Sequence, residues 1–480
     1  MNDRKGFGSN FGFLMAAVGS AVGLGNIWGF PNKMGANGGF PFLILYLALA
    51  LCCGVIIMLG ELALGRKTGH GAVGAYQSIS KRFKWLGWLG IAAAALIFSF
   101  YSALGGYCLR YVVVNFGNLI GAEFGTNGVG GADVFQGLLS QPDVSIAFAL
   151  AFMLITMLVV MCGVGGGIER VCSVGMPALF FILIICIIRS CTLPGAADGL
   201  KYMFVPGWAV ANGIIDEAPG FWRVLTAAGG QMFFSLSLGA GVMITYGSYL
   251  DKKQDLGKST MIIVGMDTVV ALMAGLCVIP GRFALDPNGA LGGPELLFIT
   301  MQNVFDKMGP AGPVFGILFY LLVFFAAISS SISMLEVIVA HFCDKAREKG
   351  KGDRRKLYSA IAVVICAALC ALVCADGMGS NHISPAELLG LTGAKLPGWS
   401  TSWLGLFDSV AEGLLMPLGA LLMCLMISWE LKPDALRQEI LLNGENRPWV
   451  YDFFRLCVKY ITPLCMLMIL YGQISDFFIV

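Results

Sequence analysis

The sequence predicts an all-α, polytopic membrane protein. Of its 480 residues, 57% are hydrophobic and only 12% are charged, whereas a soluble domain carries about 25% charged residues. Eleven apolar segments are long enough to cross a bilayer as helices. Two of these segments are interrupted in the middle by Gly and Ser, which indicates that the membrane region contains broken helices.

The distribution of basic residues orients the chain. The eleven predicted spans are 9–34, 40–64, 86–114, 146–163, 169–190, 221–250, 259–281, 311–344, 356–375, 406–430 and 450–473. An odd number of spans places the two termini on opposite sides. The loops on the side of the N-terminus hold 21 Lys and Arg residues, and those on the other side hold 8. The positive-inside rule therefore predicts that the N-terminus lies inside and the C-terminus outside.

Composition and motifs argue against catalysis and metal chemistry. The 15 cysteines lie mostly in apolar runs, where they are typical small core residues. There is no CxxC pattern, and the three histidines are scattered. We therefore expect neither an enzyme nor an organic cofactor. The net charge of +2 gives no indication of a nucleic-acid partner.

The first predicted span is weakened by Gly19, Gly23 and Gly25, because Gly is about 1 kcal/mol worse than Ala inside a helix. A helix broken at bilayer depth is tolerated only where its backbone is buried in protein or lines a cavity. Freed carbonyls can then hold a cation, and freed amides can hold a carboxylate. The same glycines are also typical of a close helix-packing face, so this span alone leaves both interpretations open.

A second interruption, with Ser235, Ser237, Gly239 and Gly241, lies about two hundred residues later. Interrupted helices at corresponding places in two halves are typical of inverted-repeat transporters, whose sites lie at the membrane midplane. Asp267 lies in the seventh span, and an intramembrane carboxylate is a functional hypothesis by default. The serines of the eighth span, 329–331, can instead provide hydrogen bonds between helices.

Four stretches carry a family resemblance: "GSAVGLGNIWGFP", "ELALGRKT", "FFSLSLGAG" followed by "TYGSY", and "FFAAISSSIS". In order and over all eleven spans, the chain resembles the neurotransmitter:sodium symporter family of the bacterial leucine-transporter type. The resemblance implies the leucine-transporter fold, a 5+5 inverted repeat with helices 1 and 6 unwound at the midplane. It would assign 1–190 to the first repeat, 191–220 to an extracellular loop, 221–430 to the second repeat, and 431–480 to an inner loop and helix 11.

The resemblance also implies two Na⁺ sites built from oxygen ligands, which suit a hard cation. The ligands of one site would be the carbonyls of Gly19, Val22 and Ala326 and the hydroxyls of Ser329 and Ser330. Those of the other would be the Ala21 carbonyl, Asn26, Ser235, Asp267 and the carboxylate of the substrate.

A pocket for an amino acid is implied next to these sites. Its lining would be Ser20, Ala21, Leu24, Gly25, Ile97, Tyr101, Phe234, Ser235, Ser237, Ala240, Ser330 and Met334. The Tyr101 hydroxyl and the amides of Leu24 and Gly25 would meet the substrate carboxylate, and Tyr101 and Phe234 would form the outer lid. The implied inner gate comprises Arg4, Phe7, Ser248, Tyr249 and Asp344, with an Arg4–Asp344 ion pair.

The chain departs from the family pattern at several positions. Gly29 stands where an outer-gate Arg is usual, although the matching acid Asp408 is present; Lys33, one helical turn later, is a candidate substitute. Ala240 replaces a usually larger residue and predicts a roomy pocket. Asp267 stands where many members have Asn, and the chain has eleven rather than twelve spans.

The resulting functional prediction is Na⁺-coupled symport by alternating access. Amine transporters of the family carry an Asp at the position of Gly23, so an α-amino acid fits better here than a monoamine. The apolar lining favours tryptophan, tyrosine, phenylalanine or a large aliphatic residue. A sodium-dependent amino-acid sensor and a transporter of another zwitterion, such as an osmolyte, remain alternatives. The setting would be a bacterial plasma membrane, and the oligomeric state stays open.

Asp267 leads to two further expectations. Relatives that use chloride hold it partly through a hydroxyl at the position of Ala271, which has none. Because Asp267 supplies a fixed negative charge instead, we expect chloride-independent transport. When sodium leaves, Asp267 would be a buried carboxylate without its cation, which makes proton countertransport a hypothesis.

Overall fold

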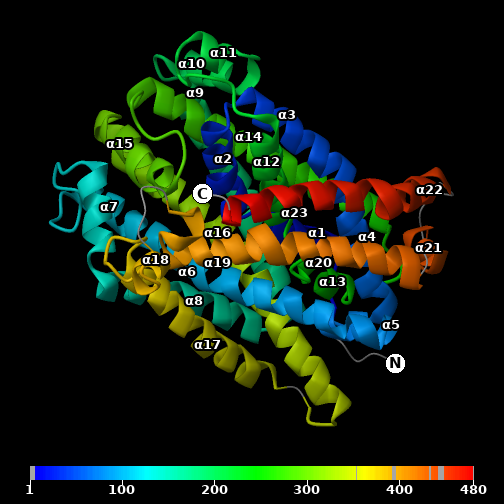
Figure 1. Ribbon diagram of the computed structural model, residues 1–480. Helices are drawn as coiled ribbons and strands as arrows, with labels where there is room; N and C mark the ends of the chain where they lie inside the picture. Colours follow the sequence, from blue (N-terminus) through cyan, green and yellow to red (C-terminus); the bar gives the residue numbers. More distant parts are fainter. Residues whose placement is uncertain (1–5, 353, 392–395, 432–433, 442–447, 479–480) are drawn as a thin grey trace.

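The computed structural model describes residues 6–352, 354–391, 396–431, 434–441 and 448–478, which form helices and no strands. In a bilayer, backbone amides and carbonyls must bond within the chain, so apolar spans of this kind fold as helices. Long helices run side by side through the molecule and shorter helices cover its two ends (Figure 1).

The helices of the first half are α1 (Asn10–Ala21), α2 (Phe30–Ala36), α3 (Phe40–Leu49), α4 (Val55–Thr68), α5 (Ala72–Ile79), α6 (Lys84–Ile120), α7 (Gly131–Leu139), α8 (Pro142–Met161), α9 (Arg170–Cys191), α10 (Ala196–Phe204) and α11 (Trp208–Ala211). Those of the second half are α12 (Phe221–Leu236), α13 (Val242–Gly247), α14 (Leu256–Leu285), α15 (Met301–Asp306), α16 (Gly312–Glu348), α17 (Arg355–Asp376), α18 (Pro385–Leu388), α19 (Trp403–Asp408), α20 (Met416–Leu425), α21 (Asp434–Leu441), α22 (Pro448–Leu456) and α23 (Thr462–Phe478).

Short π-helical or 3₁₀ segments extend or join these helices. They are η1 (Gly25–Gly29), η2 (Ala50–Gly54), η3 (Lys81–Phe83), η4 (Val164–Glu169), η5 (Leu296–Thr300), η6 (Gly309–Ala311), η7 (Gly398–Ser400), η8 (Ser409–Leu415), η9 (Met426–Leu431) and η10 (Cys457–Ile461).

The predicted spans are not all continuous helices. Within the described residues, nine helices are long and apolar enough to cross a membrane, and a tenth span is the pair Asn10–Ala21 and Gly25–Ala36, bent by 43°. The remaining predicted span, 221–250, is divided into α12 and α13, each too short to cross alone. Some helices are longer than the predicted spans: the span predicted at 86–114 lies within a helix that runs from Lys84 to Ile120.

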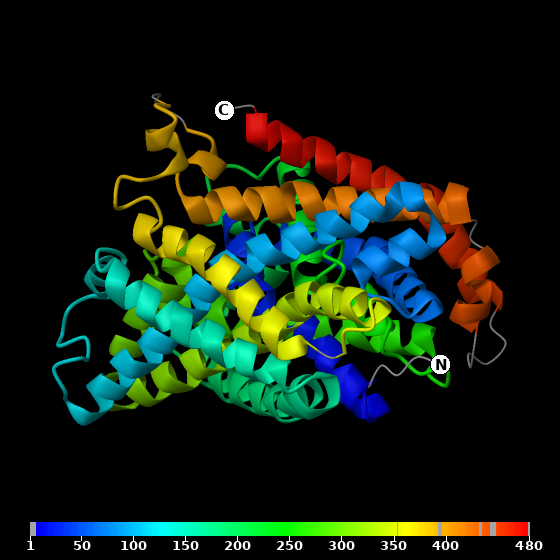
Figure 2. The ribbon, with the colours of Figure 1, turned by 90° about the horizontal axis from the view of Figure 1, so that it is seen from below.

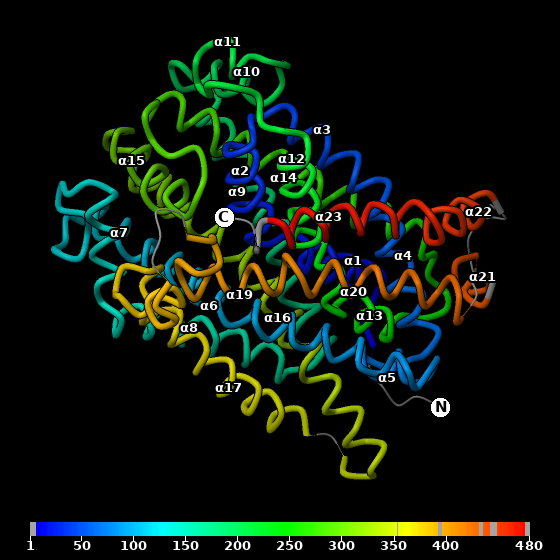
Figure 3. Tube along the Cα trace, viewed as in Figure 1, coloured from blue at the N-terminus to red at the C-terminus, as the bar shows by residue number. Residues whose placement is uncertain are grey.

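The two broken helices lie inside the bundle. The α1 helix packs against α9, α14 and α16, and α12 packs against α3 and α23. In the Cα trace, α1, α12 and α13 run through the middle of the molecule (Figure 3). Protein rather than lipid therefore surrounds both interruptions, as an irregular backbone at membrane depth requires.

The ends of the bundle are also distinct. The α5, α21 and α22 helices lie at one end and α7, α15 and α18 at the other (Figure 1). Seen from below, α1 begins near the first end and α23 runs toward the second (Figure 2). Which end faces the cell interior stays a prediction from the basic residues.

Candidate functional site

The first interruption separates α1 from η1. The α1 helix ends at Ala21, Val22 takes an extended conformation (φ −76°, ψ 97°), and helical structure resumes near Leu24. The freed amides find polar partners: the Gly23 N–H donates to Asn26 Oδ1 (3.0 Å), and the Leu24 N–H donates to the Tyr101 hydroxyl (2.7 Å). The Tyr101 hydroxyl, which comes from α6, is thus the hydrogen-bond acceptor for the free Leu24 amide at the interruption.

The second interruption, between α12 and α13, contains three residues with positive φ. Ser237 has φ 53°, and Gly239 and Gly241 have φ 77° and 74°, a region that glycine enters without steric cost. The Ser237 hydroxyl donates to the Ser20 carbonyl (3.0 Å), which joins the two interruptions directly. The Gly239 N–H donates to the buried Glu61 carboxyl (2.7 Å).

One cluster of oxygen atoms joins α1 to α16. The Ser329 hydroxyl donates to the carbonyls of Val22 (3.4 Å) and Ala326 (3.0 Å), and the Ser330 hydroxyl donates to the Gly19 carbonyl (3.3 Å). These are the five residues expected to form one sodium site. The structure brings them together, and their uncharged oxygens suit a hard cation such as Na⁺.

A second cluster centres on Asp267, which is completely buried in α14. Its carboxylate accepts hydrogen bonds from Asn26 Nδ2 (2.7 Å), from the Ser235 hydroxyl (3.0 Å to each oxygen) and from the Tyr46 hydroxyl (3.2 Å). Within the described residues, no Lys, Arg or His pairs with it. A buried carboxylate without a cationic partner is costly, so a small cation fits this cluster on charge grounds. Ala21, the remaining expected ligand, is the buried last residue of α1.

The expected pocket residues come from the end of α1, the two interruptions, α6, α12 and α16. All are buried: Ser20, Ala21, Leu24, Gly25, Ile97, Tyr101, Phe234, Ser235, Ser237, Ala240, Ser330 and Met334. The rings of Tyr101 and Phe234, the expected lid, lie 6.2 Å apart with an angle of 56° between their planes. A Cβ at Gly25 would lie only 2.9 Å from the Phe234 ring, so glycine is needed there.

Gly23, which precedes Leu24 of the expected pocket, is tightly packed. A Cβ placed on it would collide with both the Ser330 hydroxyl and the Tyr101 hydroxyl. The backbone at this point therefore has no room for any side chain while those two hydroxyls keep their positions. An acidic side chain of the kind that meets an amine is excluded in this arrangement.

Three side chains contact the site without a role predicted from the sequence: Tyr46, Glu61 and Gln231. Gln231 Nε2 donates to the Gly25 carbonyl (2.6 Å), and Tyr46 and Glu61 contact Asp267 and Gly239 as described above. The available signal was the same as for Asp267: a polar side chain inside an apolar run.

An aromatic cluster closes the end near the start of α1. The Phe7 ring lies 5.7 Å from that of Tyr246 and 6.2 Å from that of Tyr249. The Tyr249 hydroxyl donates to Glu336 (2.6 Å), and Glu336 pairs with Arg355 (2.9 Å). Phe7 and Tyr249, two expected inner-gate residues, therefore meet, and the buried Glu336–Arg355 pair anchors one of them.

The other expected inner-gate residues lie close to the same end. The Ser248 hydroxyl donates to the Thr245 carbonyl (2.6 Å), and Asp344 accepts the Gly71 N–H (3.2 Å). Arg4 lies outside the described residues, so the Arg4–Asp344 pair stays a prediction.

Gly29, which stands where the family usually has an outer-gate Arg, is packed against Gln231. A Cβ on Gly29 would lie 2.9 Å from Gln231 Oε1, so Gln231 occupies the adjacent space. Lys33 forms an ion pair with Glu412, not with Asp408, one turn earlier. Lys33, Asp408 and Glu412 line one cavity of about 290 Å³. Lys33 is therefore near the expected acid Asp408, but its ionic partner is Glu412, for which the sequence predicted no role.

Broken helices packed inside an all-helical bundle, with buried oxygen clusters at both interruptions, define the architecture of an ion-coupled secondary transporter. Residues 4–127 and 132–478 match the model of the sodium:neurotransmitter symporter family. The chain belongs to this family, which confirms the resemblance. Its members are secondary transporters rather than enzymes, and this chain is a sodium-dependent, multi-pass membrane transporter.

Relatives match over nearly the whole chain. An uncharacterized sodium-dependent transporter of Bacillus subtilis, YhdH, is 36% identical over 97% of this chain and 97% of its own length. A sodium-dependent transporter of Methanocaldococcus jannaschii, MJ1319, is 30% identical over 91% and 84%. The crystal structure of MhsT in complex with L-phenylalanine has a TM-score of 0.83 and 34% identity and covers 98% of this chain and 100% of MhsT. The leucine-transporter fold is thereby confirmed.

Proposed function

We propose that this chain couples two Na⁺ ions to the uptake of a large hydrophobic or aromatic L-amino acid. The observation that carries the proposal is the buried carboxylate of Asp267. It contacts Asn26 and Ser235, which directly follow Gly25 and Phe234 of the expected substrate pocket. A Na⁺ ion shared between Asp267 and the substrate carboxylate would link ion binding to substrate binding.

Recognition of the substrate would begin at the two interruptions. The Leu24 amide and the Tyr101 hydroxyl already form a hydrogen bond with each other, and both would turn to the incoming carboxylate. Tyr101 and Phe234 would then close over the ligand, while the Phe7–Tyr249 contact would open on the other side. Alternating these two closures moves the substrate without an open channel.

The substrate class follows from the pocket walls. Ile97, Phe234, Ala240 and Met334 are apolar, so a charged substrate side chain would find no partner among them. An amine without a carboxylate would need an acidic side chain at position 23. This position is Gly23 and has no room for a side chain, which argues against an amine as the substrate. The MhsT structure contains L-phenylalanine, which is consistent with an aromatic substrate here.

Uptake by the reconstituted protein tests the proposal. In proteoliposomes with an inward Na⁺ gradient, L-phenylalanine or L-tryptophan should accumulate, whereas phenethylamine and tryptamine should neither accumulate nor compete. Sodium-dependent binding without accumulation would instead identify a sensor, and accumulation of a small betaine in preference to aromatic amino acids would identify an osmolyte transporter.

Ala240→Phe should reverse the size preference. A larger side chain overfills the end of the pocket and penalises only substrates that reach it, by about 1–3 kcal/mol, or roughly 5- to 150-fold in affinity. Uptake of tryptophan should fall by this factor relative to that of valine, which serves as the internal control. An unchanged ratio of the two uptake rates would show that Ala240 does not line the pocket.

The Lys33–Glu412 pair should matter more than Asp408. The side chains of Lys33 and Glu412 are 23% and 9% exposed, and removal of one partner leaves a poorly solvated charge. Glu412→Gln and Lys33→Gln should each reduce uptake about tenfold, and the double variant should be no worse than either one. Asp408→Asn should have the smaller effect. If Asp408→Asn and Lys33→Gln both abolish uptake while Glu412→Gln does not, the functional pair is Lys33–Asp408.

A further inference from the structure

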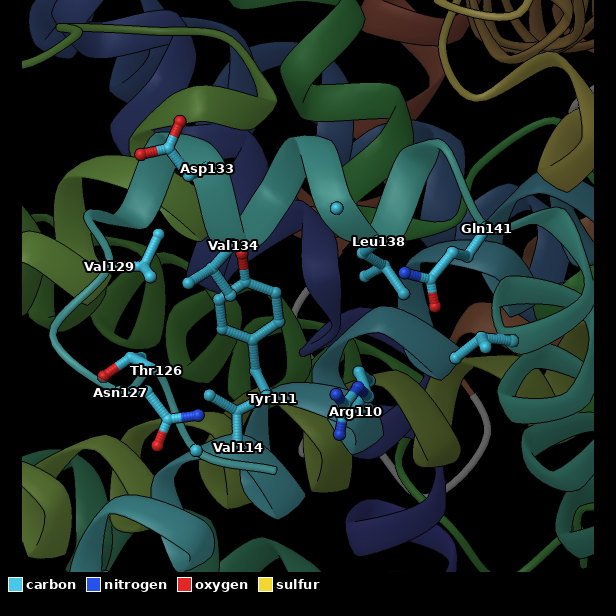
Figure 4. Close-up of a pocket in the computed structure, with 13 residues that line it drawn as sticks. Arg110, Tyr111, Val114, Thr126, Asn127, Val129, Asp133, Val134, Leu138 and Gln141 are labelled. Carbon is cyan, nitrogen blue, oxygen red and sulfur yellow. The ribbon is translucent and has the colours of Figure 1, made fainter. Parts of the chain in front are cut away.

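A cavity at the end of the molecule that carries α7 contains none of the residues assigned above. Its volume is about 260 Å³, enough for a small organic molecule. It lies between the last turns of α6, the following loop, α7 and the start of α8 (Figure 4). Its lining residues are Arg110, Tyr111, Val114, Gly125, Thr126, Asn127, Val129, Asp133, Val134, Gly137, Leu138, Gln141 and Val144.

The cavity contains a cationic side chain, Arg110, that forms no ion pair within the described residues. Arg110 is half-buried and lies ten residues before the end of α6, or about 15 Å along the helix axis. No carboxylate in the described part of the chain forms an ion pair with it, and its guanidinium donates no hydrogen bond there. The guanidinium carbon lies 5.9 Å from the centre of the Phe148 ring, the outer limit of a cation–π interaction.

Tyr111, the next residue, contributes an independent signal. Its side chain is fully buried, and its hydroxyl has no hydrogen-bond partner within the described residues. The ring is fixed by Phe298 and Tyr320, whose centroids lie 5.2 and 4.8 Å away, and it lines the cavity with its hydroxyl toward Val134 (Figure 4). A buried unpaired hydroxyl costs about 1–3 kcal/mol, so its retention on the cavity wall points to a ligand.

The remaining walls restrict the ligand. Val114, Val134, Leu138 and Val144 supply apolar surface along the cavity. Asp133, exposed on the rim, would repel a group with more than one negative charge. The cavity thus combines an uncompensated guanidinium, a free hydroxyl, an apolar wall and an acidic rim.

We propose that this cavity binds an organic monoanion, with its anionic oxygens, of a carboxylate or a phosphodiester, on Arg110 and Tyr111 and a short apolar chain against the valine and leucine wall. The site is separate from the substrate pocket and independent of the proposed substrate. Two sources offer this chemistry, a dissolved monocarboxylate and the acidic headgroup of a phospholipid. The experiment separates them.

The test is thermal unfolding of the purified full-length protein in a neutral detergent with increasing sodium valerate, at fixed Na⁺ concentration and ionic strength. Pentylammonium, with the same chain and the opposite charge, is the matched ligand control. Valerate should raise the midpoint saturably, by about 1–3 °C, and pentylammonium should not. Arg110→Gln should abolish the rise, and Tyr111→Phe, which removes one oxygen atom, should weaken valerate binding severalfold.

Lys201→Gln is the matched control variant, since Lys201 is an exposed cation in α10 that pairs with Asp198. It should respond to valerate as the wild-type protein does. Equal responses of Arg110→Gln and wild type, or no response of the wild type to valerate in any medium, would overturn the dissolved-carboxylate form of the proposal. Arg110→Lys provides a second test, because it retains the charge and should retain part of the shift.

Nanodiscs of phosphatidylcholine or phosphatidylglycerol distinguish the two sources. A valerate shift in both membranes identifies a dissolved carboxylate. A stabilisation by phosphatidylglycerol that Arg110→Gln loses, without any effect of valerate, assigns the cavity to a lipid headgroup. If neither valerate nor phosphatidylglycerol distinguishes wild type from Arg110→Gln, the cavity is not an anion site.

Discussion

Asp267→Asn is expected to reduce sodium-driven uptake at least about 100-fold. Loss of one partner of a buried charge interaction costs about 3–5 kcal/mol, which corresponds to roughly 150- to 5,000-fold in affinity. The amide keeps the size of the side chain and its ability to bond to Ser235 and Tyr46, so the expected loss is that of the charge. The fall should appear chiefly as a weaker Na⁺ dependence, because Na⁺ would lose its only charged protein ligand.

The measurement is uptake of L-phenylalanine into proteoliposomes over a range of Na⁺ concentrations. Asp198→Asn, which changes a half-exposed acid in α10, is the control and should leave uptake unaltered. Replacing chloride with gluconate should not affect the wild type, and adding chloride should not rescue Asp267→Asn, because Ala271 offers no hydroxyl. Normal Na⁺ dependence in Asp267→Asn, or loss of wild-type uptake in gluconate, would contradict this account of the charge.

Gly23→Ala is expected to lower uptake by a similar factor. The added methyl group would collide with the hydroxyls of Ser330 and Tyr101, and these cannot both retreat without disturbing the Leu24 amide and the α1–α16 contact. Small-to-large changes in packed sites cost about 1–3 kcal/mol. Because substrate and Na⁺ ligands would be displaced together, we expect the combined effect on uptake to reach about 100-fold.

The matched control is Gly175→Ala in α9, where a Cβ would meet nothing within 4 Å. Both variants should be expressed and should unfold at similar temperatures in the absence of Na⁺. Only Gly23→Ala should lose the stabilisation that Na⁺ and amino acid confer together. Wild-type uptake by Gly23→Ala would mean that Tyr101 and Ser330 are more mobile than their hydrogen bonds indicate.

The elements that sequence could predict are those whose signal is local. Glycine and serine clusters mark the two interruptions because they weaken a helix wherever it lies. Asp267 stands out because a carboxylate in an apolar run needs a partner. Within the described residues, nine of the predicted spans coincide with long apolar helices, whereas an interruption divides each of the other two, 9–34 and 221–250.

The features that sequence could not predict depend on which helices meet. Tyr46 reaches Asp267 from a helix more than two hundred residues away, and Lys33 selects Glu412 over Asp408 although the two acids are one turn apart. Arg110 was only one of several basic residues at the outer edge. Its lack of an ionic partner becomes visible once the neighbouring helices are in place. Such ion pairs and hydrogen bonds depend on how the helices pack, and the periodicity and composition of a sequence do not specify that packing.

The central claim, that ion and substrate share a site, is tested most directly by binding at equilibrium. The affinity for radiolabelled L-phenylalanine, or the best-transported amino acid, should be measured with and without Na⁺, and the affinity for Na⁺ with and without that amino acid. The account predicts that each raises the affinity of the other by the same factor, about 5- to 150-fold, because linkage is reciprocal. Substrate binding that is indifferent to Na⁺ would contradict it.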